Sequence, residues 1–506
     1  MTSSARRFGM SLKWLPERLQ PGVPETQGYA RLSVRSDNSS EKPTDAPRTL
    51  WLSHIVWLLP SFLHPSNGVS SGRRTSPTAW LDGLRGVAAF VVVWHHSSLV
   101  YFSWSIHDAW KDAENGLFVQ LPLIRLVIAG IPAVCIFFVI SGYAISLRLL
   151  RLSHLGRASD FADALSSSLF RRHPRLFMPA TFVMLVTAVM SYFGAFPTEA
   201  WSEDVAIATR LPPRADSLWD QMLNWGHQSW HLAYPVRDTV HSRDVNPYDP
   251  NLWTLPVEFG CSLLVFTVLA VMFKFRPFVR MAFLLVLIGY SLVNAEENVF
   301  LFLCGVFLAD LRTYRSLRGD TQPPELPLDT SAPRQSRRSS LGRNLGHLAA
   351  FVAALFLLSM PEMRKGAEEA PGFATLASLV PQRYLDAGKA DYFWVPLAAV
   401  LLVATLDSAP FLQRAFTSHA AQYLGDISFS MYLVHGPLLW SYGAWLAPRL
   451  IPTGEDVSAA QYGWGVALCY LCFWPVVIYE ADLVTRIVDE RSVKFARWVY
   501  NKLAKP

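Results

Sequence analysis

Residues 81–102 read LDGLRGVAAFVVVWHHSSLVYF, an apolar run long enough to cross a bilayer that also carries ionisable side chains. Asp82 and Arg85 stand near its start, and His95 and His96 lie within it. A transmembrane helix needs about 20 mostly apolar residues, and an ionisable group inside one is costly and usually functional. This stretch therefore predicts a membrane helix and places a candidate site on it.

The composition of the whole chain favours a membrane protein. Of its 506 residues, 51% are hydrophobic and 17% are charged, and the mean hydropathy is +0.23. Soluble proteins carry about 25% charged residues. The pI near 9.0 does not indicate nucleic-acid binding, because the basic residues are scattered between apolar segments as topology signals. The five cysteines lack the paired spacings of a zinc site or a disulfide framework, so we expect small core residues.

Apolar segments that are long enough to cross a bilayer, or nearly so, recur along the chain. We expect ten, at residues 83–104, 126–147, 176–194, 252–273, 279–294, 298–311, 346–360, 392–406, 424–447 and 463–485. Arg and Lys concentrate in alternate connections, which by the positive-inside rule places both termini in the cytosol. The predicted fold is all-α, a polytopic integral membrane protein with about ten transmembrane helices.

The segments outside the spans differ in composition. Residues 1–76 predict a disordered cytosolic tail with a short interfacial apolar segment at 50–63, and residues 77–490 form the expected membrane domain. Within that domain, the tryptophan-rich loop 195–251 predicts a folded non-cytosolic cap. The Pro, Ser and Arg-rich loop 312–345 predicts a disordered cytosolic connector, and 491–506 a basic cytosolic tail.

Arg85 and His96 are predicted to lie on one stripe of their helix. Eleven residues turn the helix to within about 20° of a whole number of turns and raise it by about 16 Å. Arg binds phosphate in a planar bidentate manner, and a neutral imidazole is the usual base for a hydroxyl. The stripe suits a long, thin donor with phosphates at the mouth and a reactive carbonyl inside. Alternatively, Arg85 extends to the interface and His96 only packs against another helix.

The neighbours of this pair are weaker candidates. His95 points about 80° away from Arg85 on a helical wheel, and so lies off the stripe. Asp82 is expected either to cap the N-terminus of the helix or to pair with Arg85.

The stretch LDGLRGVAAFVVVWHH resembles the signature of the acyltransferase 3 family of membrane O-acyltransferases, an Arg followed by ten residues and a His. Four further motifs occur in the family's order: FFVISGY at 137–143, RRHPRLFMP at 171–179, NLWTLPVE at 251–258 and LGDISFSMYLVH at 424–435. The resemblance covers about residues 77–490 and is similar to a fungal-type branch. It implies transfer of an acyl group, expected to be acetyl, from cytosolic acyl-CoA to a hydroxyl of a carbohydrate, lipid or small natural product.

Cationic residues before the third span are expected to bind the donor. Arg171, Arg172 and Arg175 stand around Pro174, a residue that suits the first position of a helix. Beside a positive helix end they form a plausible site for the phosphates of CoA, together with Arg85. Simple positive-inside topology is the alternative explanation.

Three residues are expected in the chemistry. His96 is the predicted general base. Glu258, a carboxylate within a span, is expected to orient a histidine or to bind the acceptor hydroxyl, unless it forms a structural ion pair. His435 is either a second catalytic or acceptor-binding group or a core histidine with satisfied hydrogen bonds.

No bound cofactor or metal is expected, and acyl-CoA is a donor substrate. His227 and His231 have zinc spacing, but Gln228 stands where the zincin motif needs Glu. The expected partners are acyl-CoA, a hydroxyl-bearing small molecule or glycan, and the lipid bilayer of an endomembrane (ER or Golgi) or the plasma membrane. The chief alternative is a secondary transporter of a small polar or amphipathic solute, although the sequence shows neither inverted repeats nor paired broken helices.

Overall fold

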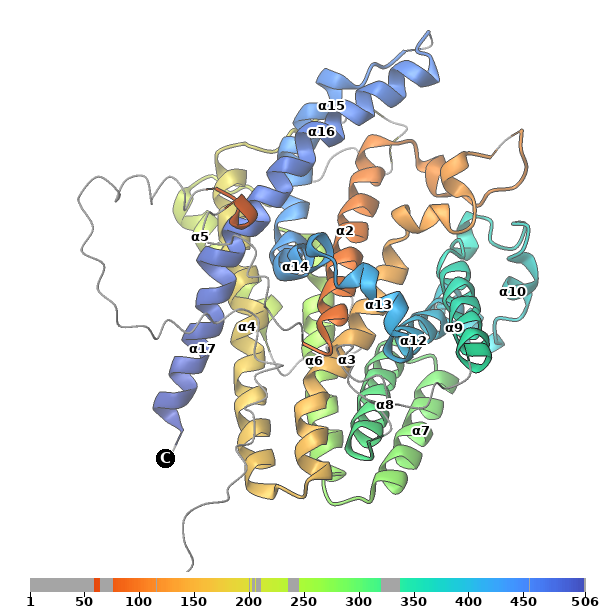
Figure 1. Ribbon diagram of the computed structural model, residues 1–506. Coiled ribbons are helices and arrows are strands. Elements are labelled where there is room, and N and C mark those ends of the chain that lie inside the picture. Colours follow the sequence, from red (N-terminus) through yellow and green to blue (C-terminus); the bar gives the residue numbers. More distant parts are fainter. Residues whose placement is uncertain are drawn as a thin grey trace, which may run out of the picture.

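The computed structural model describes residues 59–63, 76–114, 116–199, 201–202, 205, 211–234, 245–319, 337–454 and 456–504. The regular structure of these residues is helical, and their only extended pairing is an isolated bridge between Ser103 and Val205. The helices form one bundle (Figure 1). Most of the predicted N-terminal tail lies outside the described residues; of its interfacial segment, residues 59–63 are described, and Ser61–Leu63 form a short 3-10 helix.

Each of the ten expected apolar segments coincides with a helix. These are α2 (Ala79–Tyr101), α3 (Gly130–His154), α4 (Ala158–Tyr192), α6 (Thr254–Val271), α7 (Pro277–Val293), α8 (Glu297–Leu317), α9 (Arg337–Leu358), α12 (Trp394–Ser408), α14 (His419–Leu438) and α16 (Ala459–Val484). Shorter helices are α5 (Leu218–Ala233), α10 (Ala374–Ser378), α11 (Gln382–Asp386), α13 (Pro410–Phe416), α15 (Ala444–Leu450) and α17 (Glu490–Leu503).

Six helical stretches of the described chain are long and apolar enough to cross a membrane. They are Gly130–His154, Ala158–Tyr192, Pro250–Val271, Leu341–Leu358, Ala390–Ser408 and Ala459–Leu503. The other four expected spans fall short of that length or apolarity. Two of these, α2 and α14, carry the polar residues of the candidate site.

α2 and α14 lie against each other in the middle of the bundle, backbone to backbone (Figure 1). A Cβ on Gly86 would stand 2.3 Å from the Gly425 nitrogen, and one on Gly425 would stand 2.4 Å from the Asp82 carbonyl oxygen. Only glycine permits this approach. The two helices run parallel, since their contacts advance together from this glycine pair to His96 and His435.

A second close contact joins α3 to α8. A Cβ on Gly142, in the FFVISGY motif, would stand 2.1 Å from the Phe302 carbonyl oxygen, and one on Gly305 would stand 2.2 Å from the Val139 oxygen. At the far end of these helices, a buried ion pair between Arg280 of α7 and Asp310 of α8 holds α7 against α8 with contacts of 2.6 and 2.7 Å.

α4 corrects the expectation that a helix starts at Pro174. It is one helix from Ala158 to Tyr192, with Pro174 and Pro179 inside, so Arg171 and Arg172 are helical. A proline removes one helical hydrogen bond, and packing on both sides of the break can compensate for that loss. Here the segment before Pro174 packs against α17, and the Arg171 Nε bonds the Ser167 carbonyl oxygen at 3.0 Å.

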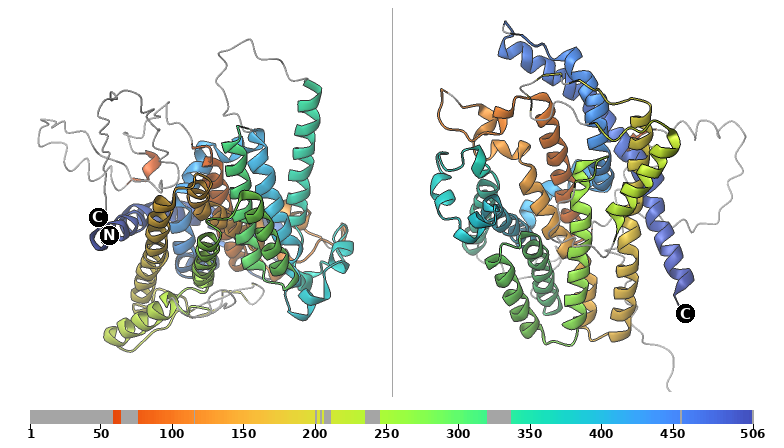
Figure 2. Two further views of the ribbon diagram at one scale, coloured as in Figure 1. Left: turned by 90° about the horizontal axis from the view of Figure 1, so that it is seen from below. Right: turned by 180° about the vertical axis from the view of Figure 1, so that it is seen from behind.

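Part of the tryptophan-rich loop flanks the bundle. α5 runs antiparallel along α4 (Figure 2), with the Trp225 Nε1 donating to the Thr181 carbonyl at 3.0 Å and the His173 Nε2 2.7 Å from the Ala233 carbonyl oxygen. Its outer face exposes Trp219 and Trp230, which are 71% and 69% accessible. The buried residues of α5 are Gln221, Ser229 and Leu232.

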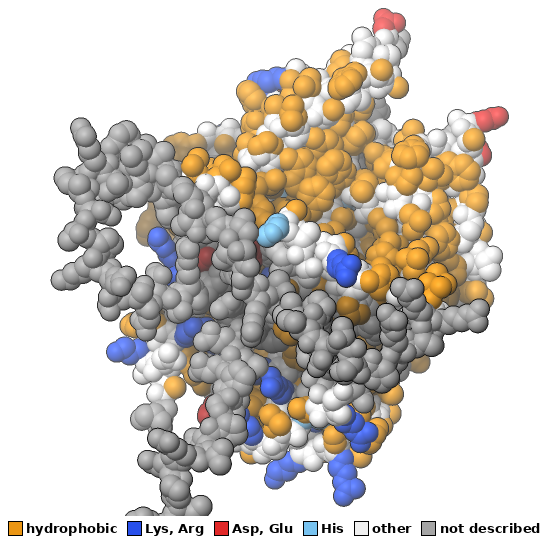
Figure 3. Space-filling model, viewed as in Figure 1, with side chains coloured by type: hydrophobic (Ala, Val, Ile, Leu, Met, Phe, Trp, Pro, Cys, Tyr) orange, Lys and Arg blue, Asp and Glu red, His pale blue; other side chains and the backbone are white. Residues whose placement is uncertain are grey.

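Helices also extend into the expected cytosolic connector and tail. α8 continues to Leu317 and α9 begins at Arg337, so both ends of the segment 312–345 are helical, while residues 320–336 lie outside the described chain. The basic tail forms α17, which follows α16 after one π-helical turn, Thr485–Asp489. Lys and Arg side chains gather in the lower half of Figure 3, below an apolar upper region.

We expect Gly142→Ala to destabilise the protein, because the added methyl meets the backbone of α8. Overpacking of this kind costs about 1–3 kcal/mol of unfolding free energy. The matched control is Gly289→Ala on α7, where nothing lies within 4 Å of an added Cβ. It should be neutral or slightly stabilising, since alanine favours a helix. Thermal unfolding of the purified variants measures both, and equal melting temperatures would contradict the close contact.

Candidate active site

A cavity of about 170 Å³ lies where α3, α6 and α8 begin, beside α2 and α14. Half of its 16 lining residues have polar side chains, including both histidines of α2, although the lining surface is mostly apolar. The lining residues are Val92, His95, His96, Gly130, Ile131, Val134, Cys135, Phe138, Asn251, Trp253, Thr254, Glu297, Asn298, Leu301, Tyr392 and Tyr432.

The structure brings His96 and His435 together across the contact between α2 and α14. The His435 Nε2 lies 3.2 Å from the His96 Nδ1, and the ring centroids are 5.0 Å apart. The His435 Nδ1 lies 2.6 Å from the Tyr432 carbonyl oxygen, which can only accept a hydrogen bond. A neutral His435 therefore carries its proton on Nδ1 and offers the lone pair of Nε2 to His96.

Asn251 and Tyr432 hold this pair in place. The Asn251 Nδ2 lies 3.2 Å from the His435 Nε2, and the Tyr432 hydroxyl bonds the Asn251 carbonyl and lies 2.7 Å from the Thr254 hydroxyl. A side chain on Gly436 would meet Asn251 within 2.9 Å. Sequence reasoning assigned no role to Asn251 or Tyr432, although both stand in motifs that it quoted.

His95, the weaker candidate, also lines the cavity. Its Nδ1 lies 2.6 Å from the Ile128 carbonyl oxygen, and its ring packs against Gly130, where a Cβ would come within 2.5 Å. Its ring is also 5.2 Å from that of His107, in the loop after α2. Burial, with nearby positive charges, lowers the pKa of His107 to about 2, so this imidazole is neutral.

Arg85 lies about 16 Å before His96 along α2. Its Nε donates to the Ser428 hydroxyl and its Nη2 to the Gly425 carbonyl, both at 3.1 Å. Asp82 is 3.3 Å from the guanidinium and lies in the first turn of α2, whose N-cap is Thr78. Of the two expectations for Asp82, the pair with Arg85 is present and the N-cap is wrong.

Glu258, one turn into α6, binds an arginine and a serine hydroxyl. Its Oε1 accepts from the Arg172 Nη2 at 2.6 Å and from the Ser141 hydroxyl at 3.0 Å. The Arg172 Nε also donates to the Ser262 hydroxyl at 3.1 Å. Glu258 therefore fixes one of the predicted donor-binding arginines, which agrees with the alternative of a structural ion pair.

Arg175, another of the predicted arginines, lies on α4 with Arg172. Arg175 interacts electrostatically with Asp489, Arg172, Arg85 and Glu258. Asp489, buried in the π-helical turn before α17, was missed by sequence reasoning. Its signal was a carboxylate at the end of the last apolar segment.

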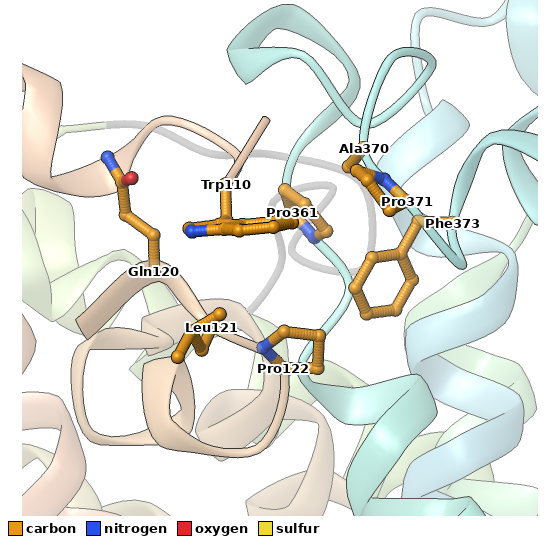
Figure 4. A pocket seen from close by; sticks show the side chains of 8 residues that line it. All are labelled: Trp110, Gln120, Leu121, Pro122, Pro361, Ala370, Pro371 and Phe373. Carbon is orange, nitrogen blue, oxygen red and sulfur yellow. The ribbon is translucent and has the colours of Figure 1, made fainter. Parts of the chain in front are cut away.

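The other histidine motif and the other cavity lack a comparable arrangement. Among the described residues, no group of three or more His, Cys, Asp or Glu side chains is placed to hold a metal ion, and the rings of His227 and His231 are 6.5 Å apart on the exposed side of α5. The second cavity, of about 180 Å³, lies in the loops between Trp110 and Pro361 (Figure 4). Its lining is almost entirely apolar, so it offers no base or phosphate-binding group.

Comparison with known proteins identifies the family of this chain. The family model of the acyltransferase domain known as acyltransferase 3 matches residues 78–480. The chain belongs to the acyltransferase 3 family. It is therefore a membrane O-acyltransferase by family, in agreement with its six apolar helices. No solved structure gives a significant match.

The relatives include fungal and bacterial acyltransferases. O-acetyltransferase PaAT-1 of Phomopsis amygdali is 38% identical over 93% of this chain and 94% of its own. Acyltransferase R4 of a Phoma species is 27% identical over 85% of this chain and 97% of its own. Peptidoglycan O-acetyltransferase OatA of Listeria monocytogenes is 24% identical over 71% of this chain and 49% of its own.

We expect Glu258→Gln to lower the unfolding free energy by about 2 kcal/mol, because it leaves the Arg172 guanidinium without its counter-charge. The two side chains are 22% and 11% exposed. The double variant Arg172→Met and Glu258→Gln removes both charges and should recover much of the loss. Thermal unfolding in detergent compares the wild type, Glu258→Gln, Arg172→Met and the double variant. A double variant that loses the sum of the two single effects would contradict the pairing.

Proposed function

We propose that the protein transfers an acetyl group from cytosolic acetyl-CoA to a hydroxyl of a small acceptor, with His96 as the general base. The pairing of His96, which lines the cavity, with His435 carries this proposal. The arginines at the other end of α2 and along α4 support the choice of a phosphate-bearing donor. The 38% identity to an O-acetyltransferase over nearly the whole chain supports acetyl as the acyl group.

The donor spans the distance between the two ends of the site. Its pyrophosphate binds near Arg85, Arg172 and Arg175, where bidentate guanidinium contacts match phosphate geometry. The pantetheine arm follows α2 over about 16 Å and brings the thioester carbonyl to His96. Both termini and the Arg-rich helix ends lie on the cytosolic side in this orientation, as the positive-inside rule requires.

The chemistry needs a single proton carrier. With its Nδ1–H donated to His435, His96 presents its Nε2 lone pair as the base. It removes the acceptor's proton as the hydroxyl oxygen attacks the thioester carbonyl. The new C–O bond forms, the C–S bond breaks, and the proton passes from His96 to the CoA thiolate. No covalent enzyme intermediate is required, because both substrates are held together.

The cavity sets the type of acceptor. Phe138, Trp253 and Leu301 offer an apolar wall, whereas Asn251 and Asn298 offer hydrogen bonds. A hydroxyl-bearing molecule with one apolar and one polar face fits such a lining, and both a glycosylated lipid and a small natural product meet this condition. The acceptor enters from the side opposite to the donor, on an endomembrane or the plasma membrane.

The test of the function is acetyl-CoA-dependent acetylation by membranes that contain the wild-type protein or His96→Ala. Host metabolites and glycans are compared by mass spectrometry. Loss of the base should reduce product formation by about 10²–10⁴-fold. The control is Ser97→Ala, the next residue on α2, whose hydroxyl bonds the Trp94 carbonyl at 2.9 Å. Undiminished acetylation by His96→Ala would overturn the base, and the absence of any product from the wild type supplied with candidate acceptors would favour a transporter.

His435 is proposed as a positioning residue for His96. We expect His435→Leu to lower kcat at least tenfold while the KM for acetyl-CoA stays unchanged, because the donor arginines lie at the other end of α2. His435→Gln should recover part of kcat, since a glutamine oxygen can accept from the His96 Nδ1–H. Steady-state kinetics of the purified variants give both constants. An equal loss of kcat in His435→Leu and His435→Gln, or a raised KM for acetyl-CoA, would indicate a merely structural role.

A further inference from the structure

α17 lies beyond residues 78–480, the part of the chain that the family model matches, yet it packs against the donor-binding helix. The Tyr500 hydroxyl lies 3.2 Å from the Ser166 hydroxyl of α4, and the Tyr500 ring is 5.7 Å from that of Phe170. Figure 2 shows α17 beside the first half of α4. The two helices run antiparallel, because Asp489, at the start of this segment, acts on Arg175, further along α4.

This register brings Arg497 to Arg171. Arg497 precedes Tyr500 by about one turn, or about 4.5 Å, and so faces a level of α4 just beyond Phe170. Arg171 occupies that level. In agreement, Arg171 interacts electrostatically with Arg497 and also with Arg148 of α3. Arg148 is exposed, whereas Arg171 and Arg497 are half-buried.

Arg148, Arg171 and Arg497 form an outer cluster, and Arg85, Arg172 and Arg175 are the inner arginines. Within the described chain, carboxylates neutralise the inner arginines but not the outer cluster. Glu258 pairs with Arg172, Asp82 with Arg85, and Asp489 acts on Arg175. Among the described residues, no carboxylate is recorded within salt-bridge distance of the outer three, and the Arg171 Nε donates to a backbone carbonyl. Arg148 and Arg497 each repel Arg171, and such a concentration of positive charge favours the binding of an anion of high charge.

We propose that Arg148, Arg171 and Arg497 form a phosphomonoester site that binds the 3′-phosphate of the CoA donor. This inference rests on the proposed use of acetyl-CoA. The donor carries a pyrophosphate on one side of its ribose and a doubly charged phosphomonoester on the other. Arg171 and Arg175 are about 6 Å apart along α4, so the inner arginines hold the pyrophosphate while the outer cluster holds the 3′-phosphate. α17 thereby completes the donor site from outside the family's domain.

The test compares acetyl-CoA with 3′-dephospho-acetyl-CoA as donors for the purified full-length protein. Wild type should show a KM about tenfold higher for the dephospho donor, the worth of one charge-assisted contact of about 1.4 kcal/mol. Arg497→Gln should raise the KM for acetyl-CoA about tenfold, with kcat unchanged, and leave the KM for the dephospho donor as in wild type. Arg497→Lys keeps the charge, so its KM for acetyl-CoA should lie between those of the wild type and Arg497→Gln.

The control variant is Arg491→Gln, on the exposed side of α17, which should leave both KM values unchanged. Arg148→Gln, at an exposed position of α3, should behave like Arg497→Gln and serves if the α17 variant does not fold. A wild-type protein that uses both donors with equal KM would overturn the site, while His96-dependent transfer would leave the proposed function intact. Transfer from neither donor would overturn both.

The same three guanidiniums could bind the phosphate of a lipid headgroup. The kinetics are therefore repeated in nanodiscs with neutral or anionic lipid. A KM effect of Arg497→Gln that is specific to the 3′-phosphate and equal in both lipids supports the donor site. An effect that appears only in anionic lipid and is the same for both donors would overturn it in favour of a headgroup site.

Discussion

The backbone contact between α2 and α14 at Gly86 and Gly425 determines how the rest of the candidate site is arranged. Because no side chain separates the helices there, Arg85 reaches a carbonyl and a hydroxyl of α14. Because the helices are parallel, the same contact places His435 beside His96 further along. A polar pair inside a membrane protein is tolerated when its members hydrogen-bond each other. The helix contact brings His96 and His435 close enough to do so.

The sequence predicted the class of fold and much of the site, because membrane spans and helical stripes follow from local patterns. The ten apolar segments coincide with helices, and the eleven-residue step from Arg85 to His96 lies on one helix as expected. The pairing of His96 with His435 is different. It joins residues far apart in the chain, and nothing in the local pattern of α14 indicates which face of it meets α2.

Two outcomes depend on tertiary contacts. Pro174 was expected to start a helix because proline is disfavoured inside an isolated helix, but packing of α17 and α6 against α4 supports a continuous helix. For Glu258 the sequence left three roles open, namely orienting a histidine, binding the acceptor hydroxyl or forming a structural ion pair. The structure contains the ion pair, with Arg172 of a helix whose register could not be known from sequence. Tertiary contacts decide such partners.

The parallel register of α2 and α14 also bears on how these two segments can evolve. His96 stands ten positions after Gly86, and His435 stands ten positions after Gly425. The spacing from glycine to histidine is therefore the same in the two helices. One residue gained or lost within either interval would turn the following histidine by about 100° and shift it by about 1.5 Å. Two stretches that lie far apart in the gene are therefore constrained to keep equal lengths, and an insertion in one can survive only with a matching insertion in the other.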